Sequence, residues 1–374
     1  MSHGDACGSD GDWGHDTWDT YSNAYPRIYK HTSLPVTVFE DVEGPATTTR
    51  TRVHYSSMPG YISSVDDFYT IKGLANLVVT ETSITAYDKS VLVQNEHTVF
   101  SWIRVVVANA LSNDGATWVE LFSKYNSGTY NNQWLVIDLS KWHAYQTPEK
   151  GFFYLVEQTP VRIITQDLTQ KVVREGYFAS YNQPYSKDVW HIMGYGDASK
   201  KSKKPETFHY DTCPRAVVFG KLWDVVVNTT DMAFVMGWND LGRKVVDSAE
   251  RQDSPLQSFV SAVSAGARFL GQLSTELPAS DTSSLTAANG ICARDDLVAG
   301  KERRAYGGID AKIASYTSLM DYTVPLAWAR AGPTDDEKPS YCWVEGDDIS
   351  LKTPHYGHPE CYMWDWQLMY GGLR

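Results

Sequence analysis

Two polar strings that end in tryptophan constrain the fold of this chain more than any other feature. The first is Gly14-His15-Asp16-Thr17-Trp18, near the start, and the second is Asn-Ser-Gly-Thr-Tyr-Asn-Asn-Gln-Trp, which runs from Asn126 to Trp134. Each has several hydrogen-bonding side chains in a segment where a core strand would have Val or Ile. We therefore interpret both strings as parts of built sites.

The composition excludes several classes of protein. The chain has 374 residues, of which 42% are hydrophobic and 21% charged, and its net charge is −12. These values are typical of a soluble globular protein with one large domain or two closely packed ones. The acidic balance argues against a nucleic-acid partner, because phosphate binding needs a surplus of Lys and Arg on one face. We interpret the basic run Lys200-Lys201-Ser202-Lys203-Lys204 as a solvated loop.

Membrane and disulfide signals are weak. No stretch approaches the ~18 consecutive apolar residues of a membrane-spanning helix, so we expect no transmembrane segment. Residues 1–14 have no apolar run like the core of a signal peptide. Five cysteines are too few for a disulfide scaffold, and one stays unpaired if the others pair. They are Cys7, Cys213, Cys292, Cys342 and Cys361.

Local patterns predict a mixture of strands and helices. Runs rich in β-branched and aromatic residues predict strands over Pro35–Phe39, Leu77–Thr85, Trp134–Leu139, Phe152–Leu155, Val161–Ile164 and Ala216–Phe219. Apolar spacing of three and four predicts helices over Phe100–Leu111, Trp118–Tyr125 and Leu256–Leu273. Because strands and helices do not alternate regularly, an α+β layered fold is favoured over a doubly wound parallel sheet. Long loops are expected over Asp197–Thr207 and Pro278–Asn289.

Several catalytic signatures are missing from the sequence. It has no Gly-x-Ser-x-Gly elbow, His-Glu-x-x-His helix, paired Cys-x-x-Cys or Walker loop. The N-terminal acidic and histidine residues have no regular metal-ligand spacing, so a polar loop is the better interpretation. These residues are His3, Asp5, Asp10, Asp12, His15 and Asp16. We expect neither a metal nor an organic cofactor.

Cys7 is a candidate nucleophile. A cysteine at the start of a catalytic chain can act through its thiolate, with its own α-amine as base, because that amine titrates near pKa ~8. Such a terminus is usually made when the thiol attacks the preceding carbonyl, here that of Ala6. The alternative is an ordinary surface thiol in a tail rich in Gly, Ser and Asp.

Many further motifs occur in order from about residue 14 to about residue 366. After Gly14–Trp18 come Pro26–Lys30, Pro59–Tyr61, Ser64–Tyr69, Val79–Thr82, Trp102–Arg104, Ser112–Trp118, Asn126–Trp134, Ala179–Tyr185, Pro214–Ala216, Ala293–Leu297, Gly307–Lys312, Gly332–Thr334 and His355–Pro359. Together they resemble the phospholipase B-like family, also called the laminin-ancestor family.

That resemblance implies an N-terminal-nucleophile hydrolase fold, an αββα sandwich of two antiparallel sheets between helical layers. The precursor would be cut just before a catalytic cysteine, and this chain would correspond to the larger, C-terminal fragment. Cys7 would be the nucleophile, with His15 and Trp18 on the next strand. Thr82 would contact the α-amine or the substrate. The last two assignments are Asn182 as oxyanion donor and Arg215 as a residue that orders the surroundings of the nucleophile.

Each role has a structural alternative. Asn182, before Gln183-Pro184, could shape a turn, and Arg215 could serve a structural carboxylate. His15 could be an acid or base, or a hydrogen-bonded strut. The string ending at Trp134 is expected to tie a loop to the sheet through side-chain amides.

The start of the chain departs from the family pattern. Only eight positions separate Cys7 from His15, about half the family's spacing, and the residues between them are too few for both strands of a hairpin. Either that hairpin is lost or the sequence begins wrongly. We therefore divide the chain into a truncated or irregular N-terminal segment, residues 1–13, and a hydrolase domain, residues 14–374.

The resemblance implies a phospholipase B-like hydrolase that removes acyl chains from glycerophospholipids, or cleaves a related acyl amide, through a cysteine acyl-enzyme. The alternative is an inactive relative that binds a lipid or a glycan, since 13% of the residues are aromatic. Expected partners are a phospholipid or other acyl lipid and a missing upstream fragment. The family resemblance also implies a lysosomal or secreted glycoprotein, and Asn228-Thr229-Thr230 is a weak glycosylation signal.

Overall fold

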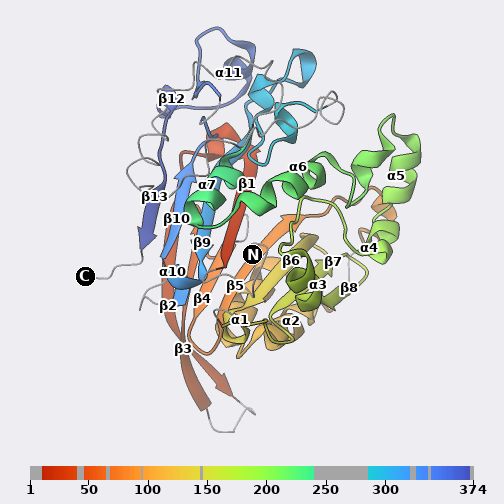
Figure 1. Ribbon diagram of the computed structural model, residues 1–374, viewed down its shortest axis with the longest axis vertical. Helices are drawn as coiled ribbons and strands as arrows, with labels where there is room; N and C mark the ends of the chain where they lie inside the picture. The colour runs from red at the N-terminus through yellow and green to blue at the C-terminus, as the bar shows by residue number, and fades with distance from the viewer. Residues whose placement is uncertain are drawn as a thin grey trace.

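Two antiparallel sheets packed face to face form the centre of the computed structural model (Figure 1). It describes residues 11–39, 46–64, 68–93, 96–143, 146–239, 285–320, 326–335 and 338–370. Cys7 and the helix predicted over residues 256–273 lie outside these ranges, as does most of the loop predicted over residues 278–289.

The larger sheet has seven strands, each paired with the next along the chain. They are β2 (Ile28–Phe39), β3 (Ala46–Ser57), β4 (Phe68–Lys72), β5 (Asn76–Ser83), β6 (Asn132–Asp138), β7 (Phe153–Gln158) and β8 (Ile163–Asp167). Short connections join the strands except between β5 and β6, where two helices intervene. This meander places β5 and β6 side by side near the middle of the sheet.

The smaller sheet joins the two ends of the chain. Its order is β1-β9-β10-β13, with β1 (Asp12–Thr20), β9 (Tyr306–Ser315), β10 (Leu326–Ala331) and β13 (Gln367–Tyr370). Figure 1 shows β1, in red, lying against β9, in blue. Strand β1 begins at Asp12, so it includes the last two residues of the segment that we expected to be truncated or irregular.

Alternating side chains give the larger sheet two apolar faces. One face presents Phe68, Val78 and Ile137 to the smaller sheet, where Ala314 and the partly buried Trp13 meet them. The other face is apolar as well, because both faces of this sheet are buried.

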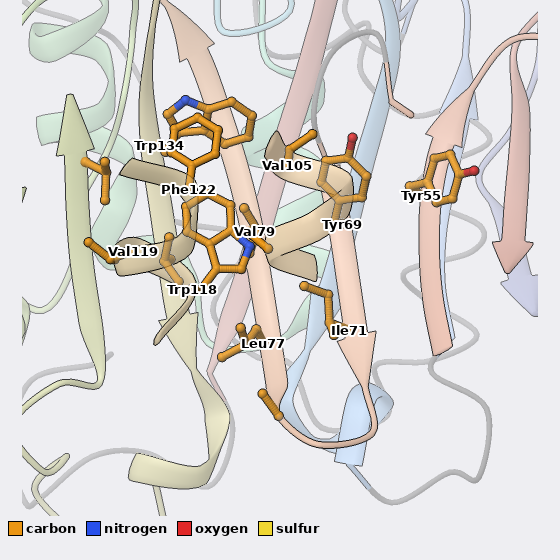
Figure 2. Close-up of a cluster of buried hydrophobic side chains, with 14 residues drawn as sticks. Tyr55, Tyr69, Ile71, Leu77, Val79, Val105, Trp118, Val119, Phe122 and Trp134 are labelled. Carbon is orange, nitrogen blue, oxygen red and sulfur yellow. The ribbon is translucent and has the colours of Figure 1, made fainter. Parts of the chain in front are cut away.

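The opposite face of the larger sheet is covered by α1 (Ser101–Leu111) and α2 (Gly115–Ser123). Figure 2 shows Trp118 and Phe122 of α2 against Trp134 of β6. Helix α2 begins where it does because the Asp114 side chain accepts a hydrogen bond from the Thr117 backbone N–H at 2.7 Å.

On the outer face of the smaller sheet lie α6 (Pro214–Leu222) and α7 (Thr229–Gly237). Gly14 permits the close approach of α7, since a Cβ atom there would lie 2.5 Å from the Met236 Cγ atom. Helices therefore cover both sheets, which confirms the predicted α+β sandwich of two antiparallel sheets between helical layers.

The remaining elements lie around this sandwich. They are α3 (Thr169–Glu175), α4 (Lys187–Ile192), α5 (Tyr195–Lys201), α10 (Tyr316–Met320), α11 (Asp348–Lys352), β11 (Tyr341–Cys342) and β12 (Cys361–Tyr362). A disulfide joins Cys342 to Cys361. No helix in the described ranges has the length and apolar character needed to cross a membrane.

Two local predictions were wrong. The strand predicted over Ala216–Phe219 is part of α6, which begins at Pro214, a residue that favours the first helical turn. The loop predicted over Asp197–Thr207 contains α5 and a 3₁₀ helix, Pro205–Phe208. Tyr195, Trp190 and Phe208 pack in one apolar cluster, and Trp190 donates its indole N–H to the Phe208 carbonyl oxygen at 2.8 Å, so both packing and a hydrogen bond hold this region.

Candidate active site

His15 connects the two sheets. It lies on β1 and is 7% exposed, and its Nε2 atom donates to the Glu81 carbonyl oxygen of β5 at 2.8 Å. A carbonyl oxygen can only accept, so Nε2 carries the hydrogen in this contact. In the neutral ring Nδ1 is then the basic nitrogen.

Thr82, the next residue on β5, lies in a network of polar side chains. Its Oγ1 atom is 2.5 Å from Ser180 Oγ and accepts from the Asn182 backbone N–H at 3.3 Å. Ser180 also donates to Gln133 Oε1. Gln133 is directly opposite Thr82 in the β5–β6 pairing, so alternation places both side chains on the face toward the smaller sheet.

Asn182 belongs to the 176–186 segment, which connects α3 to α4. Its φ angle of 64° is in the left-handed region, which Asn tolerates better than most residues. The side-chain Nδ2 atom donates to the Ser83 carbonyl oxygen at 2.9 Å and lies 3.4 Å from Ser83 Oγ. One strong bond thus orients an amide that has two hydrogens.

A buried carboxylate supports the 176–186 segment from β7. Glu157 accepts from Gln133 Nε2 at 2.9 Å and from the backbone N–H groups of Tyr185 and Ser186, each at 2.7 Å. Burial raises the pKa of Glu157 above its usual value. Its oxygens thus fix the segment that carries Asn182.

Trp18 and Arg215 form a second contact between distant elements. The guanidinium carbon of Arg215 lies 3.6 Å from the centroid of the Trp18 ring. Arg215 donates to the Ala288 carbonyl oxygen at 3.2 Å, and Trp18 donates to that of Ile291 at 3.1 Å. Burial lowers the pKa of Arg215 to about 10. It remains a cation at neutral pH and forms no ion pair within the described ranges.

The elements that carry these residues form a closed ring of contacts. Strand β1 contacts β5, β5 contacts the 176–186 segment, that segment contacts α6, and α6 contacts β1. The contacting pairs are His15–Glu81, Thr82–Ser180, Tyr181–Phe219 with ring centroids 6.0 Å apart, and Arg215–Trp18. The structure therefore gathers the elements of five predicted site residues around one region, and their roles stay predictions.

A buried ion cluster of Arg27, Asp310 and Lys312 was not predicted from the sequence. Asp310 accepts from Arg27 Nε at 2.6 Å and from Lys312 Nζ, and Lys312 also donates to Thr17. Lys312 is paired with His15 across β1 and β9, so a buried ammonium lies on the same face as the imidazole. The sequence signal for this cluster was the motif Gly307–Lys312, which is one of the motifs shared with the family and contains both Asp310 and Lys312.

The described free cysteines do not fit a nucleophile. Cys213 and Cys292 are both buried, and burial raises the pKa of each thiol, that of Cys292 to about 12. A raised pKa disfavours the reactive thiolate. Within the described ranges, no three His, Cys, Asp or Glu side chains are grouped so that they could hold a metal ion.

Comparisons with known proteins agree on a family. The family model described as Phospholipase B matches residues 10–369. Phospholipase B-like 1 of Homo sapiens is 32% identical over 358 residues, which cover 95% of this chain and 54% of that protein. Phospholipase B of Crotalus adamanteus is 31% identical over 360 residues, with the same coverage of 95% and 54%. The chain thus spans about half the length of these relatives.

Among solved structures, a variant of conjugated bile acid hydrolase from Clostridium perfringens is similar to this chain. It has a TM-score of 0.39 and 9% sequence identity, and the match covers 98% of this chain and 96% of that one.

Proposed function

Because the chain belongs to the phospholipase B family, we propose that it hydrolyses acyl bonds of glycerophospholipids, or of a related acyl amide, through a cysteine acyl-enzyme. The assignment as a hydrolase rests on the family. The proposed acyl-enzyme mechanism is supported by the closed ring of contacts, which is the observation that carries this proposal. It places a histidine, an amide donor and a buried guanidinium on neighbouring elements.

In the proposed reaction the Cys7 thiolate attacks the acyl carbonyl carbon. A C–S bond forms, and the C–O or C–N bond to the leaving group breaks as that group takes a proton. Water then attacks the thioester, which releases the fatty acid and restores the thiol. Both bond types pass through a tetrahedral oxyanion, so one site can act on either.

The side chains have separate proposed roles. The free hydrogen of the Asn182 amide would donate to the oxyanion, while Ser83 keeps the amide oriented. His15 would exchange a proton through Nδ1. Thr82 would position Asn182, whose N–H it accepts, or contact substrate directly. Arg215 and Trp18 would order the wall next to the nucleophile.

The proposal is tested by measuring fatty-acid release from mixed phospholipids and from an N-acyl amide. The chain is compared with its Cys7→Ala variant, and Cys213→Ala serves as the matched control because it removes a different free thiol. Release that is lost with Cys7→Ala and kept with Cys213→Ala supports the mechanism. Release that survives Cys7→Ala contradicts it.

A second candidate is an inactive family member that binds a lipid or a glycan. One observation favours it, a cavity of about 640 Å³ whose lining includes five aromatic residues, Tyr61, Phe100, Trp102, Tyr130 and Trp134. No release from either substrate, together with ligand binding, would support this candidate.

A lysosomal or secreted location is also proposed. The disulfide between Cys342 and Cys361 supports it, because such bonds persist mainly in oxidising compartments. Asn228, in the glycosylation signal, caps α7 through its side chain, which accepts from Thr230 and Asp231. A mass measurement of the secreted protein before and after glycosidase treatment tests whether Asn228 is modified.

A further inference from the structure

The cavity of about 640 Å³ lies on the face of the larger sheet that is opposite the Thr82 network. Three segments surround it: residues 60–64, the beginning of α1, and Thr129–Tyr130 from the Asn126–Trp134 string. Its lining includes Trp134, and none of the described residues that line it is charged. The volume lies within the range of about 300–1,000 Å³ that is usual for small-molecule sites.

The outer wall of this cavity is aromatic and open to solvent. Tyr61, Phe100 and Trp102 are 54%, 57% and 45% exposed, respectively. Exposed aromatic side chains that are grouped around a cavity mark binding sites more often than scattered ones do. This wall fits the hydrocarbon part of a ligand.

The inner wall has a donor that lacks a partner. Trp134 is 1% exposed, and its indole N–H forms no hydrogen bond within the described ranges. Figure 2 shows its nitrogen on the side of the ring turned away from Trp118. Buried donors are almost always paired in native proteins. A ligand that brings an acceptor to Trp134 would satisfy this group.

Ser101, also in the lining, is arranged as a second donor. Its Oγ atom accepts from Arg104 Nη2 at 3.2 Å and from Gln158 Nε2 at 3.0 Å, so both of its lone pairs are used. Its own hydrogen must point elsewhere, either to Thr129 Oγ1 at 3.3 Å or to a ligand.

A buried positive charge lies behind these donors. Arg104 is 4% exposed, and its hydrogen-bond acceptors are all neutral: the Val99 and Phe122 carbonyl oxygens, Ser101 and Asn126. It has no carboxylate partner in the described part of the chain. It also follows the N-terminus of α1 by one turn, where the helix dipole adds positive potential.

We propose that this cavity binds the anion of a fatty acid. The carboxylate would accept from Trp134 Nε1 and Ser101 Oγ, and the hydrocarbon chain would lie against Tyr61, Phe100 and Trp102. Donors and positive potential on one wall and aromatic rings on the other are complementary to a ligand with both an anionic head and an apolar tail. This inference does not depend on the chain being a hydrolase.

The experiment is a fluorescence titration of the full chain with cis-parinarate, a fluorescent fatty acid. Trp134→Phe keeps an aromatic ring and removes only the N–H donor. We expect it to weaken binding about tenfold or more, the effect of losing one hydrogen bond to a charged acceptor. The matched control is Trp142→Phe, because Trp142 is also buried with an unpaired indole N–H but lies between the sheets. It should bind like the unchanged chain.

Two further comparisons test the two walls of the cavity separately. Trp102→Ala changes an exposed side chain, so it should weaken binding without changing the melting temperature. The methyl ester of the same fatty acid is uncharged, so it should bind more weakly than the acid, and Trp134→Phe should weaken its binding less than that of the acid. Unchanged binding by both Trp134→Phe and Trp102→Ala would overturn the proposed site. The carboxylate assignment would be overturned if the ester bound as tightly as the acid. It would also be overturned if dodecyl phosphate, added as a competitor, displaced cis-parinarate as well as a fatty acid of the same length does.

Discussion

His15 donates from Nε2 to the Glu81 carbonyl oxygen at 2.8 Å, and this single contact ties β1 of one sheet to β5 of the other. Glu81 directly precedes Thr82, so the histidine is held beside the polar network that orients Asn182. The contact gives His15 a structural role whether or not it transfers protons. A change at His15 would therefore affect activity and stability together, and other residues give cleaner tests.

Asn182→Gly tests the proposed oxyanion donor. Glycine adopts the φ angle of 64° without strain, so the variant removes the amide and keeps the backbone. If the amide stabilises the oxyanion, kcat for fatty-acid release should fall about 100-fold with little change in KM. The measurement is a steady-state rate series on the substrate that the chain hydrolyses.

Ser83→Ala is the control for Asn182→Gly. It removes the hydroxyl at 3.4 Å from Asn182 and keeps the carbonyl oxygen at 2.9 Å that orients the amide. Its kcat should stay within about threefold of the unchanged chain, since a long and weak contact is lost. A full rate in Asn182→Gly would mean that Asn182 only shapes its segment.

The stacked pair of Arg215 and Trp18 should show energetic coupling. Arg215→Lys keeps the charge but loses the planar group that lies 3.6 Å from the Trp18 ring centroid, and Trp18→Leu removes the ring. A double-mutant cycle by urea unfolding should give a coupling free energy of about 1 kcal/mol. Additive effects of the two changes would show that the contact contributes nothing to stability.

The layered fold could be predicted because it depends on local patterns. Runs rich in β-branched and aromatic residues predicted β5, β6 and β7, and the three-and-four spacing predicted α1 and α2. The run Ala216–Phe219 also looks like a strand, but Pro214 before it was the stronger signal for a helix. Short apolar runs do not distinguish strand from helix without such a boundary residue.

The site could be predicted only as a set of residues. Thr82 and Gln133 are paired across β5 and β6 although two helices separate them in sequence, and no local pattern fixes that register. Glu157 gave no signal at all, because its role depends on two backbone N–H groups of a distant segment. The resemblance gave His15 and Asn182 as candidates, and the structure added the contacts between their elements.

Gly307 should be far less tolerant of substitution than another glycine with positive φ. A Cβ atom at Gly307 would lie 2.0 Å from the Ala293 carbonyl oxygen, which accepts a hydrogen bond from Gly308. Gly307→Ala should lower the free energy of unfolding by about 4 kcal/mol or more. Gly300→Ala, with φ of 75° and no atom within 4 Å, should cost only about 1 kcal/mol. Chemical unfolding of both variants measures the difference, and equal losses would contradict the predicted clash.

His54 should make the folded protein less stable in mild acid. Its ring is fully buried on β3 and stacked on His31 at 4.2 Å, and burial lowers its pKa from 6.5 to about 3, with the charges of His31, Arg52 and Lys72 acting in the same direction. Below pH 6.5 the unfolded chain binds a proton at this position and the folded chain does not. The contribution of His54 to stability is therefore complete above pH 6.5 and is lost as the pH falls toward 3.

The slope from one such group reaches about 1.4 kcal/mol per pH unit. His54→Phe keeps an aromatic ring and cannot be protonated, so its unfolding free energy should fall less steeply between pH 6.5 and pH 4 than that of the unchanged chain. Urea unfolding at several pH values measures this slope. His191→Gln, at an exposed position on α4, should leave the slope unchanged. If the His54→Phe slope matches that of the unchanged chain, acid lability arises elsewhere, and the imidazole of His54 is protonated in the folded protein as readily as in the unfolded one.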